Sequence, residues 1–455
     1  MKVLKFGGTS VGSIDSLRNV KAIVESQQTE CIVTVSALGG ITDCLMDCAR
    51  RASVGDNTYM ELHRAMKERH HSVIDGVVTD ASRHAEVTEK VDSLLQQLST
   101  LFDAIALLGE LTQRTMDLIV SYGERMSCVI VCNMLSDAAL CYSPDFIRTR
   151  FRFGKHVLAP EATSKLIAQI VAPKLKTHRT IVVPGFIARD EDSGKITNLG
   201  RGGSDYTAAI IAAEFSAEIL EIWTDVDGFM TADPRIVKNA VVIDRMSFVE
   251  AMELCNFGAK VVYSPTIYPV FNHNIPIVIK NTFNAQAPGT IIADGEVFAT
   301  RMAGLTSMTP TAIIRITGCR PVNFDRVFNS LSRNGVDIFM ASPEHGTFGL
   351  RGSDVESAMA ILSDELADEL TTGEIENIQP ITGLSTIALV GSALDSMTDV
   401  DKVLINVLNG CGIPVPAPPR MNSSTTVACM VPEQSLHEAL RAVHSTFFPS
   451  CTPIS

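Results

Sequence analysis

Short apolar runs rich in valine and isoleucine alternate with longer amphipathic stretches from residue 1 to about residue 292. The short runs have the length of strands, and the longer stretches place apolar residues at helical spacing. This alternation predicts a layered α/β domain around a mostly parallel sheet, whose ligands bind outside the carboxyl ends of the strands. The clearest strand candidates are Val3–Phe6, Cys31–Ser36, Thr180–Pro184, Ile219–Thr224 and Pro276–Lys280.

Residues 56 to 123 are mostly helical in pattern, with leucines interspersed among acidic and basic positions. We expect a helical insertion or subdomain here. Nothing in it suggests chemistry, and the His70-His71 pair is expected on a solvated helix surface.

After about Gly289 the pattern changes to two similar units of strand, helix, strand, strand and helix. This order predicts tandem ferredoxin-like βαββα repeats, joined by an acidic connector at Glu365–Pro380. The first unit comprises Thr311–Thr317, Phe324–Asn334, Val336–Met340, Thr347–Arg351 and Val355–Leu366, and the second comprises Ile387–Val390, Val400–Asn409, Ile413–Val415, Thr425–Met430 and Gln434–Thr446.

Composition narrows the function classes. The 455 residues carry a formal net charge of −13, which argues against a nucleic-acid-binding surface. The sequence contains neither an uninterrupted apolar run of about eighteen residues nor a basic, apolar leader. We therefore expect a cytoplasmic protein without a membrane segment. The 11 cysteines are scattered without C-x-x-C pairs, so neither a disulfide framework nor a protein metal site is expected.

The segment Lys5–Ser10, Lys-Phe-Gly-Gly-Thr-Ser, follows the first strand directly. Adjacent glycines let backbone amides converge on an anion, Thr9 and Ser10 add hydroxyls, and Lys5 adds positive charge. The lysine precedes the glycines, unlike in a Walker P-loop. Taken alone, the segment fits a phosphate cradle and a simple turn about equally.

A second glycine-rich string, Asn198–Asp205, precedes a clean helical pattern at Tyr206–Phe215. Its turn and the helix N-terminus favour anions, and Arg201 can bind a carboxylate or phosphate with two hydrogen bonds. The alternative is that Ser204 or Asp205 only caps the helix.

Together these strings resemble those of the aspartokinase family, over essentially the whole chain. The resemblance implies a three-layer αβα amino-acid-kinase domain over 1–293, with the insertion at about 56–123. A regulatory region over 294–455 would hold ACT domains at about 310–380 and 381–455, the second completed by a strand near 300–309. The other matching strings are Val35–Thr42, Gly123–Ser127, Pro184–Phe186, Trp223–Gly228, Asp233–Arg235 and Phe257–Val261.

The family's reaction moves the γ-phosphoryl group of ATP to the side-chain carboxylate of L-aspartate. Such a transfer needs alignment and charge neutralisation more than a base, which agrees with the absence of a nucleophilic pair. The resemblance implies that Lys5 stabilises the moving phosphoryl group and that Asp205 organises the surrounding lysines. Mg²⁺ is implied by ATP and would be held largely by phosphate oxygens and water.

The resemblance also implies the binding residues. Without it, Glu124 beside Arg125 predicts a helix surface pair, Thr42 a helix N-cap, Asp225 a turn residue and Lys260 a solvated side chain. The positions matching the family's aspartate site are Thr42, Glu124, Arg201 and Ser204. Those matching its nucleotide site are Lys5, Gly7, Gly8, Thr9, Thr224, Asp225, Arg235 and Lys260.

Some positions depart from the family pattern. Met230 stands where many members have a tyrosine, and Tyr263-Ser264 replaces a His-Pro pair. The stretches Met340–Gly346 and Ala417–Ser424 match the family's effector loops only loosely. The resemblance still implies that a lysine or threonine effector can bind, and that the ACT domains form a homodimer or a higher homo-oligomer.

Two other function classes remain open at this stage: another amino-acid kinase of the superfamily, and an amino-acid sensor without turnover. No G-x-G-x-x-G follows a strand, so the chain as given is expected to lack a fused homoserine dehydrogenase.

Overall fold

The computed structural model describes residues 1–152, 155–294, 302–319 and 322–449; it does not describe the side chains of 266 and 417–422. The chain divides into two compact units, which are described separately. The first unit comprises Met1–Phe229 and Val261–Asp294, and the second comprises Met230–Lys260 and Gly295–Ser455. The predicted division at residue 293 stays a prediction; by contacts, residues 230–260 group with the second unit.

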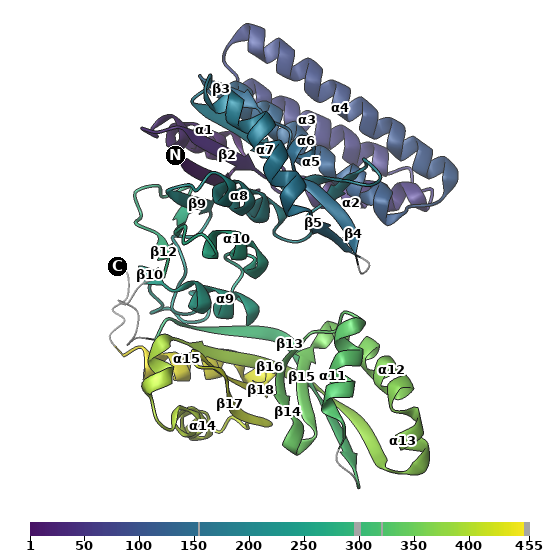
Figure 1. Cartoon of the computed structure of the whole chain (residues 1–455), viewed down its shortest axis with the longest axis vertical. Helices are drawn as coiled ribbons and strands as arrows, with labels where there is room; N and C mark the ends of the chain where they lie inside the picture. The colour runs from purple at the N-terminus through teal and green to yellow at the C-terminus, as the bar shows by residue number, and fades with distance from the viewer. Residues whose placement is uncertain (153–154, 295–301, 320–321, 450–455) are drawn as a thin grey trace. The chain divides into compact units, whose positions relative to one another are not determined.

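A mostly parallel sheet forms the centre of the first unit (Figure 1). Its strands lie in the order β12-β11-β9-β1-β2-β6-β3, parallel except for β12. Their bounds are β1 Lys2–Phe6, β2 Cys31–Val35, β3 Ala138–Leu140, β6 Thr180–Pro184, β9 Ile219–Thr224, β11 Ile277–Asn281 and β12 Thr290–Ile292. The five predicted strands are confirmed.

Helices cover both faces of this sheet. Leu4 and Phe6 point into a core shared with α1 to α5, whereas Lys5 points to the opposite face and pairs with Asp205 of α8. This alternation is the two-residue period of a strand. The helices are α1 Ile14–Glu25, α2 Ile41–Ser53, α3 Tyr59–Val77, α4 Ala81–Leu108, α5 Gln113–Met134, α6 Ser143–Phe146, α7 Pro160–Leu175, α8 Gly203–Glu214 and α10 Tyr268–Phe271.

The predicted helical insertion forms α3, α4 and the start of α5, the long helices in Figure 1. His70, expected on the surface, is fully buried, and its Nδ1 lies 2.8 Å from the carbonyl oxygen of Met66. Burial lowers the pKa of His70 to about 4, so it is a neutral core residue. Among the described residues α4 alone is long and apolar enough to cross a membrane, a weak indication because core helices also meet this criterion.

A small sheet beside the main one has the order β5-β4-β7-β8. Its strands are β4 Arg148–Arg152, β5 Lys155–Leu158, β7 Ile187–Asp190 and β8 Ile196–Asn198.

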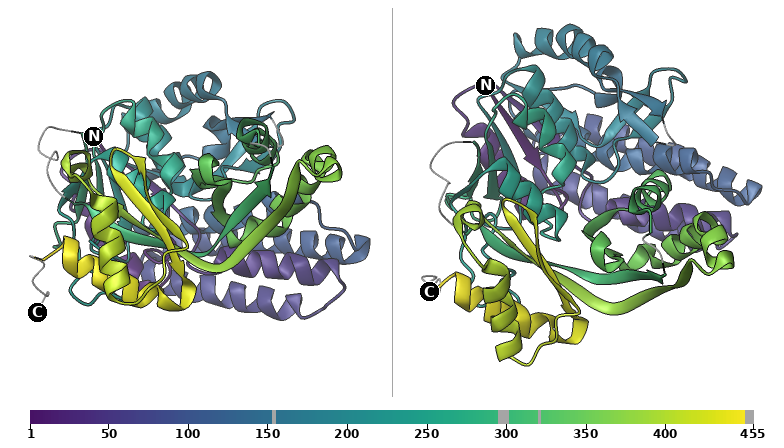
Figure 2. Two further views of the ribbon diagram at one scale, coloured as in Figure 1. Left: turned by 90° about the horizontal axis from the view of Figure 1, so that it is seen from below. Right: turned by 60° about the horizontal axis from the view of Figure 1, so that its bottom comes forward.

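The second unit contains a six-stranded antiparallel sheet with the order β14-β15-β13-β16-β18-β17. Its two longest strands, β13 and β16, pair with each other over most of their length, and Figures 1 and 2 show them side by side. Each ferredoxin-like half uses one half of both strands. The bounds of its strands are β13 Gly304–Gly318, β14 Ile338–Ser342, β15 Thr347–Arg351, β16 Ile375–Val390, β17 Ala417–Ser423 and β18 Thr426–Pro432. The unit also contains the short strand β10 Arg245–Met246, which is not part of this sheet.

These shared strands correct two predictions. Glu365–Pro380 is not a connector throughout, because β16 begins at Ile375 and Ile378 pairs with Ile316. The strand predicted at Ile413–Val415 comes later in the chain, as β17. The strand sought near 300–309 is the first part of β13; residues 300 and 301 lie outside the described part.

Alternate residues of this sheet face opposite sides. Ile314 belongs to a core beneath the helices, whereas Ile313 packs on the other side with Phe257, the residue that follows α9. Gly258, with a φ of +123°, lies so close to β13 that a Cβ would be 2.0 Å from the Ser307 carbonyl oxygen. The helices of this unit are α9 Phe248–Asn256, α11 Phe324–Arg333, α12 Val355–Glu365, α13 Ala367–Thr372, α14 Val400–Gly410 and α15 Leu436–Phe447.

Gly258→Ala should destabilise the second unit through both its backbone conformation and this steric clash, by about 3 kcal/mol or more. Gly335→Ala is the control, because Gly335 has a φ of +79° but open space where its Cβ would be. We expect a loss of about 1 kcal/mol there. Calorimetric melting compares the two; equal losses would contradict the close approach.

Candidate active site

An ion pair between Lys5 and Asp205 lies at the carboxyl edge of the first unit's sheet. The Lys5 Nζ is 2.6 Å from the Asp205 Oδ1, and the two side chains are only 12% and 11% exposed. Lys5 stands near the end of β1, and Asp205 stands in the first turn of α8. A carboxylate is favoured at a helix N-terminus, and the lysine neutralises it. The two residues predicted to be catalytic are therefore in direct contact.

The glycine turn after β1 is anchored to the neighbouring strand β9. The Gly7 N–H donates to the Trp223 carbonyl at 3.2 Å, so this amide, predicted to hold phosphate, already has an acceptor. The Ser10 hydroxyl is buried, donates to the same carbonyl at 3.2 Å and lies 2.7 Å from the Thr282 hydroxyl oxygen. Ser10 is thus structural, and Gly8 is the glycine of the pair that lines the pocket.

The turn after β2 forms a second wall. Gly40, with a φ of +81°, is the N-cap of α2, so the alternative reading of Thr42 as the N-cap is wrong. Thr42 and Asp43 lie in the first helical turn and line the pocket. Asp43 is a pocket residue that was not predicted, although it directly follows the string Val35–Thr42.

Glu124 comes from the middle of α5 and is 4% exposed, so the predicted surface pair with Arg125 is wrong. Its Oε1 accepts a hydrogen bond from the Ala37 N–H at 3.1 Å, and its Oε2 is buried without a partner among the described residues. Burial raises the pKa of Glu124 to about 8, although the Ala37 N–H opposes the rise. The Oε2 of this carboxyl therefore lacks a cationic or hydrogen-bond-donating partner among the described residues.

The turn before α8 forms the remaining wall. The turn carries Arg201, and Ser204 follows in the first turn of α8. Ser204 packs tightly against Gly185, because a Cβ on Gly185 would be 2.6 Å from the Ser204 Cβ. The resulting cavity of about 380 Å³ is open to solvent and has two cations, Lys5 and Arg201. Its lining residues are Lys5, Gly8, Ser36, Ala37, Leu38, Gly39, Gly40, Thr42, Asp43, Glu124, Phe186, Gly200, Arg201, Gly202, Gly203, Ser204 and Asp205.

All four predicted aspartate residues line this cavity, whereas most predicted nucleotide residues do not. Thr224 is the last residue of β9, whose end lies beside that of β1. Asp225 follows the strand, and the Thr224 hydroxyl donates to its carboxylate at 3.2 Å. Arg235 and Lys260 belong to the second unit. The Arg235 guanidinium makes a two-pronged ion pair with Asp233.

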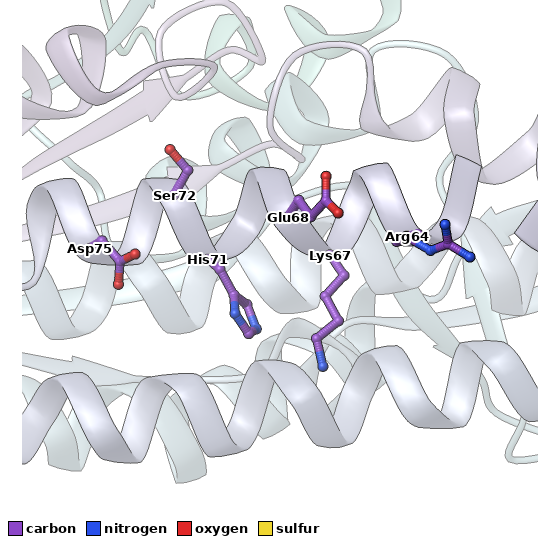
Figure 3. Close-up of a pocket in the computed structure, with 6 residues that line it drawn as sticks. All are labelled: Arg64, Lys67, Glu68, His71, Ser72 and Asp75. Atoms are coloured by element: carbon purple, nitrogen blue, oxygen red, sulfur yellow. The ribbon is translucent and has the colours of Figure 1, made fainter. Parts of the chain in front are cut away.

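A second cavity, of about 470 Å³, lies along α3 and shares no lining residue with the active-site cavity. Figure 3 shows its six lining side chains on one helix, with Lys67 and His71 directed toward the adjacent helix. Both contact Asp92 of α4, at 2.9 and 2.8 Å. These are mixed charges on a solvated helix face and offer no catalytic pair.

The raised pKa of Glu124 predicts a pH-dependent stability. Because its pKa is about 8 when folded and near 4.5 when unfolded, the folded state holds the extra proton between these values. The protonated Glu124 carboxyl stabilises the folded state at low pH, and this stabilisation is lost as the pH rises from about 4.5 to about 8. Glu124→Gln cannot titrate, so the melting temperature of the wild type should fall relative to that of the variant between pH 5 and 8. A constant difference would contradict this assignment.

Comparison with known proteins places this site in context. The model of the amino acid kinase family matches residues 1–281. The bifunctional aspartokinase/homoserine dehydrogenase of Haemophilus influenzae is 30% identical over 98% of this chain and 56% of its own length. Lysine-sensitive aspartokinase 3 of Escherichia coli is 29% identical over 98% of this chain and 99% of its own. The chain thus spans about half the length of its bifunctional relatives.

Solved structures of aspartokinases are similar to this chain over nearly its whole length. Escherichia coli aspartokinase III in complex with aspartate and ADP, in the R-state, has a TM-score of 0.84 at 27% identity, covering 98% of this chain and all of that one. The same enzyme with lysine and aspartate, in the T-state, has a TM-score of 0.76 at 27% identity, covering 98% and 99%. Since the family model covers well over half of the residues, the chain belongs to the amino acid kinase family.

Proposed function

We propose that this protein is an aspartate kinase, which transfers the γ-phosphoryl group of ATP to the side-chain carboxylate of L-aspartate. A carboxylate oxygen forms a bond to the γ-phosphorus, the bond to the β–γ bridging oxygen breaks, and ADP leaves. The observation that carries the proposal is the Lys5–Asp205 pair in one cavity with Arg201 and the buried Glu124. The similarity to aspartokinases over the whole chain supports it.

The cavity offers a complementary group for each charge of aspartate. Arg201 can hold a carboxylate with two hydrogen bonds, and Glu124 can accept the α-ammonium, which supplies the partner that its Oε2 lacks. Thr42 and Ser204 add hydroxyl groups at the walls. Because the nucleophile is an ionised carboxylate, no general base is needed.

Lys5 neutralises charge on the moving phosphoryl group, and Asp205 holds the lysine in place. Gly8 and Thr9 offer backbone amides to phosphate, and Gly7 supports them through its bond to Trp223. Mg²⁺ bound to ATP would be held largely by phosphate oxygens and water and would add charge neutralisation. No group of three or more histidine, cysteine or acidic side chains suited to a metal occurs among the described residues.

The other nucleotide contacts we propose are Thr224, Asp225, Arg235 and Lys260. Asp233 holds the Arg235 guanidinium in a defined position in its own turn. Met230 would leave the nucleotide without the aromatic contact found in many family members. Tyr263-Ser264 lies beside the active-site turn, because a Cβ on Gly202 would be 2.3 Å from the Tyr263 Cβ.

The second unit is proposed to be regulatory. Its two ferredoxin-like halves correspond to the ACT pair, and the related Escherichia coli enzyme has been solved with lysine. We propose a lysine or threonine effector, a homodimer formed through this unit, and a cytoplasmic location.

Lys5→Ala should lower kcat by at least about 100-fold while changing KM for ATP by less than about threefold, because the lysine acts on charge that develops during transfer. Lys2→Ala is the matched control: it lies on the same strand, but its ion pair is with Glu221 at 3.3 Å, outside the pocket. Aspartate-dependent ADP release measures both variants. An unchanged kcat in Lys5→Ala would refute the mechanism.

Titration of lysine or threonine into the same assay should inhibit turnover, since binding at the second unit shifts the enzyme to a less active state. D-lysine and D-threonine serve as controls for specific recognition. If neither L-amino acid changes the rate, the regulatory assignment is wrong and the ACT pair serves assembly alone.

A further inference from the structure

The helical insertion, to which the sequence assigned no chemistry, contributes one arginine to the loops of the active site. Arg69 lies on α3, and its Nη2 donates a hydrogen bond to the Gly12 carbonyl at 2.9 Å. Gly12 ends the glycine turn that begins directly after β1. The side chain is half-buried, unlike Arg64 and Lys67 of the same helix, which are exposed.

The same guanidinium also reaches the second loop of the pocket. Its Nη1 is 3.9 Å from the position that a Cβ on Gly40 would occupy. Gly40 begins α2 without a side-chain cap. One side chain therefore lies at the end of the first active-site loop and at the start of the helix that forms the second wall.

The two loops approach each other closely at their glycines. A Cβ on Gly39 would be 3.0 Å from the Gly8 carbonyl oxygen, and a Cβ on Gly12 would be 3.5 Å from the Gly39 nitrogen. Such glycine contacts allow close approach but include no interlocking side chains. Arg69 is a side chain positioned to fix one loop against the other.

The position of this cation is unfavourable for helix stability. A positive charge beside a helix N-terminus opposes the helix dipole, so Arg69 does not stabilise α2 electrostatically. Its charge and the α2 N-terminus together make this wall attractive to anions. The carboxylate of Asp43 lies in the first turn of α2 and partly balances that charge.

We propose that Arg69 is a positioning residue for phosphoryl transfer, which holds the Gly7–Gly12 loop against the start of α2. Through that contact it fixes Lys5 and Gly8 relative to Thr42, on opposite walls of the cavity. The inference rests on the proposed kinase function. Phosphoryl transfer depends on alignment within fractions of an ångström, so a small separation of the loops affects turnover more than ground-state binding.

Arg69→Gln tests this inference, with Arg64→Gln as control. Arg64 lies on the same helix, exposed at the cavity in Figure 3, and its replacement makes the same change in charge. We expect Arg69→Gln to lower kcat roughly tenfold, because the variant loses the charge-assisted hydrogen bond to the Gly12 carbonyl. The KM values for ATP and aspartate should change less than about threefold. Arg69→Lys should restore part of the lost kcat, and Arg64→Gln should match the wild type.

A second measurement does not require activity. Hydrogen exchange of the amides in residues 6–13 and 37–44 should be faster in Arg69→Gln than in Arg64→Gln, because the loops are no longer held together. A lower melting temperature with unchanged kcat would reduce Arg69 to a structural residue and overturn the proposal. Unchanged exchange in both segments would overturn it as well.

Failure of this inference is distinguishable from failure of the kinase assignment. If the wild type turns over aspartate and Lys5→Ala does not, but Arg69→Gln behaves as the wild type, only the role of Arg69 is refuted. If the wild type gives no aspartate-dependent ADP, the function is wrong, and the exchange experiment still decides whether Arg69 holds the loops.

Discussion

A lysine and an aspartate held 2.6 Å apart at the edge of a parallel sheet are the interaction on which the site depends. The sheet register places Lys5 at the end of β1, and the glycine turn before α8 places Asp205 opposite it. Largely desolvated ion pairs are costly unless other polar groups support them, and removing one partner leaves the other charge buried. Here the helix N-terminus supports the aspartate, and the open cavity leaves the lysine accessible to an incoming anion.

The rest of the pocket follows from this pair. The lining has two cations, Lys5 and Arg201, and two carboxylates that balance them, Asp43 and Asp205, while Glu124 is protonated near neutral pH. The lining side chains therefore carry little net charge, although the proposed ligands are strongly charged. Binding an ammonium group beside Glu124 would favour loss of its proton, so ligand binding and ionisation are coupled at this position.

Much of the fold and of the candidate site could be predicted from the sequence, and the predictions that were wrong or missing have a common cause. Glycine strings and strand ends are local signals, so Lys5, Arg201 and Asp205 can be identified as candidates without knowledge of their spatial arrangement. The start of β16 was read as a connector because Ile375–Pro380 is polar and acidic, and only its pairing with β13, some sixty residues away, makes it a strand. Burial of His70 and the contact of Arg69 with Gly12 depend likewise on which helices pack together. Helical periodicity alone does not identify that partner.

The segment Met230–Lys260 lies between β9 and β11 in the chain, yet its apolar residues belong to the core of the second unit. Ala232, Val237 and Ala240 pack in one cluster with Leu305 and α15, where the Thr231 hydroxyl also lies 3.0 Å from the His444 Nε2. The two units are consequently not separable by a single cut. A fragment ending near residue 293 would retain this segment without the surface that buries it, and would expose apolar side chains that favour aggregation. The first unit therefore cannot be exchanged between such proteins as one continuous piece of chain. A chimaera must keep Met230–Lys260 together with the rest of the second unit.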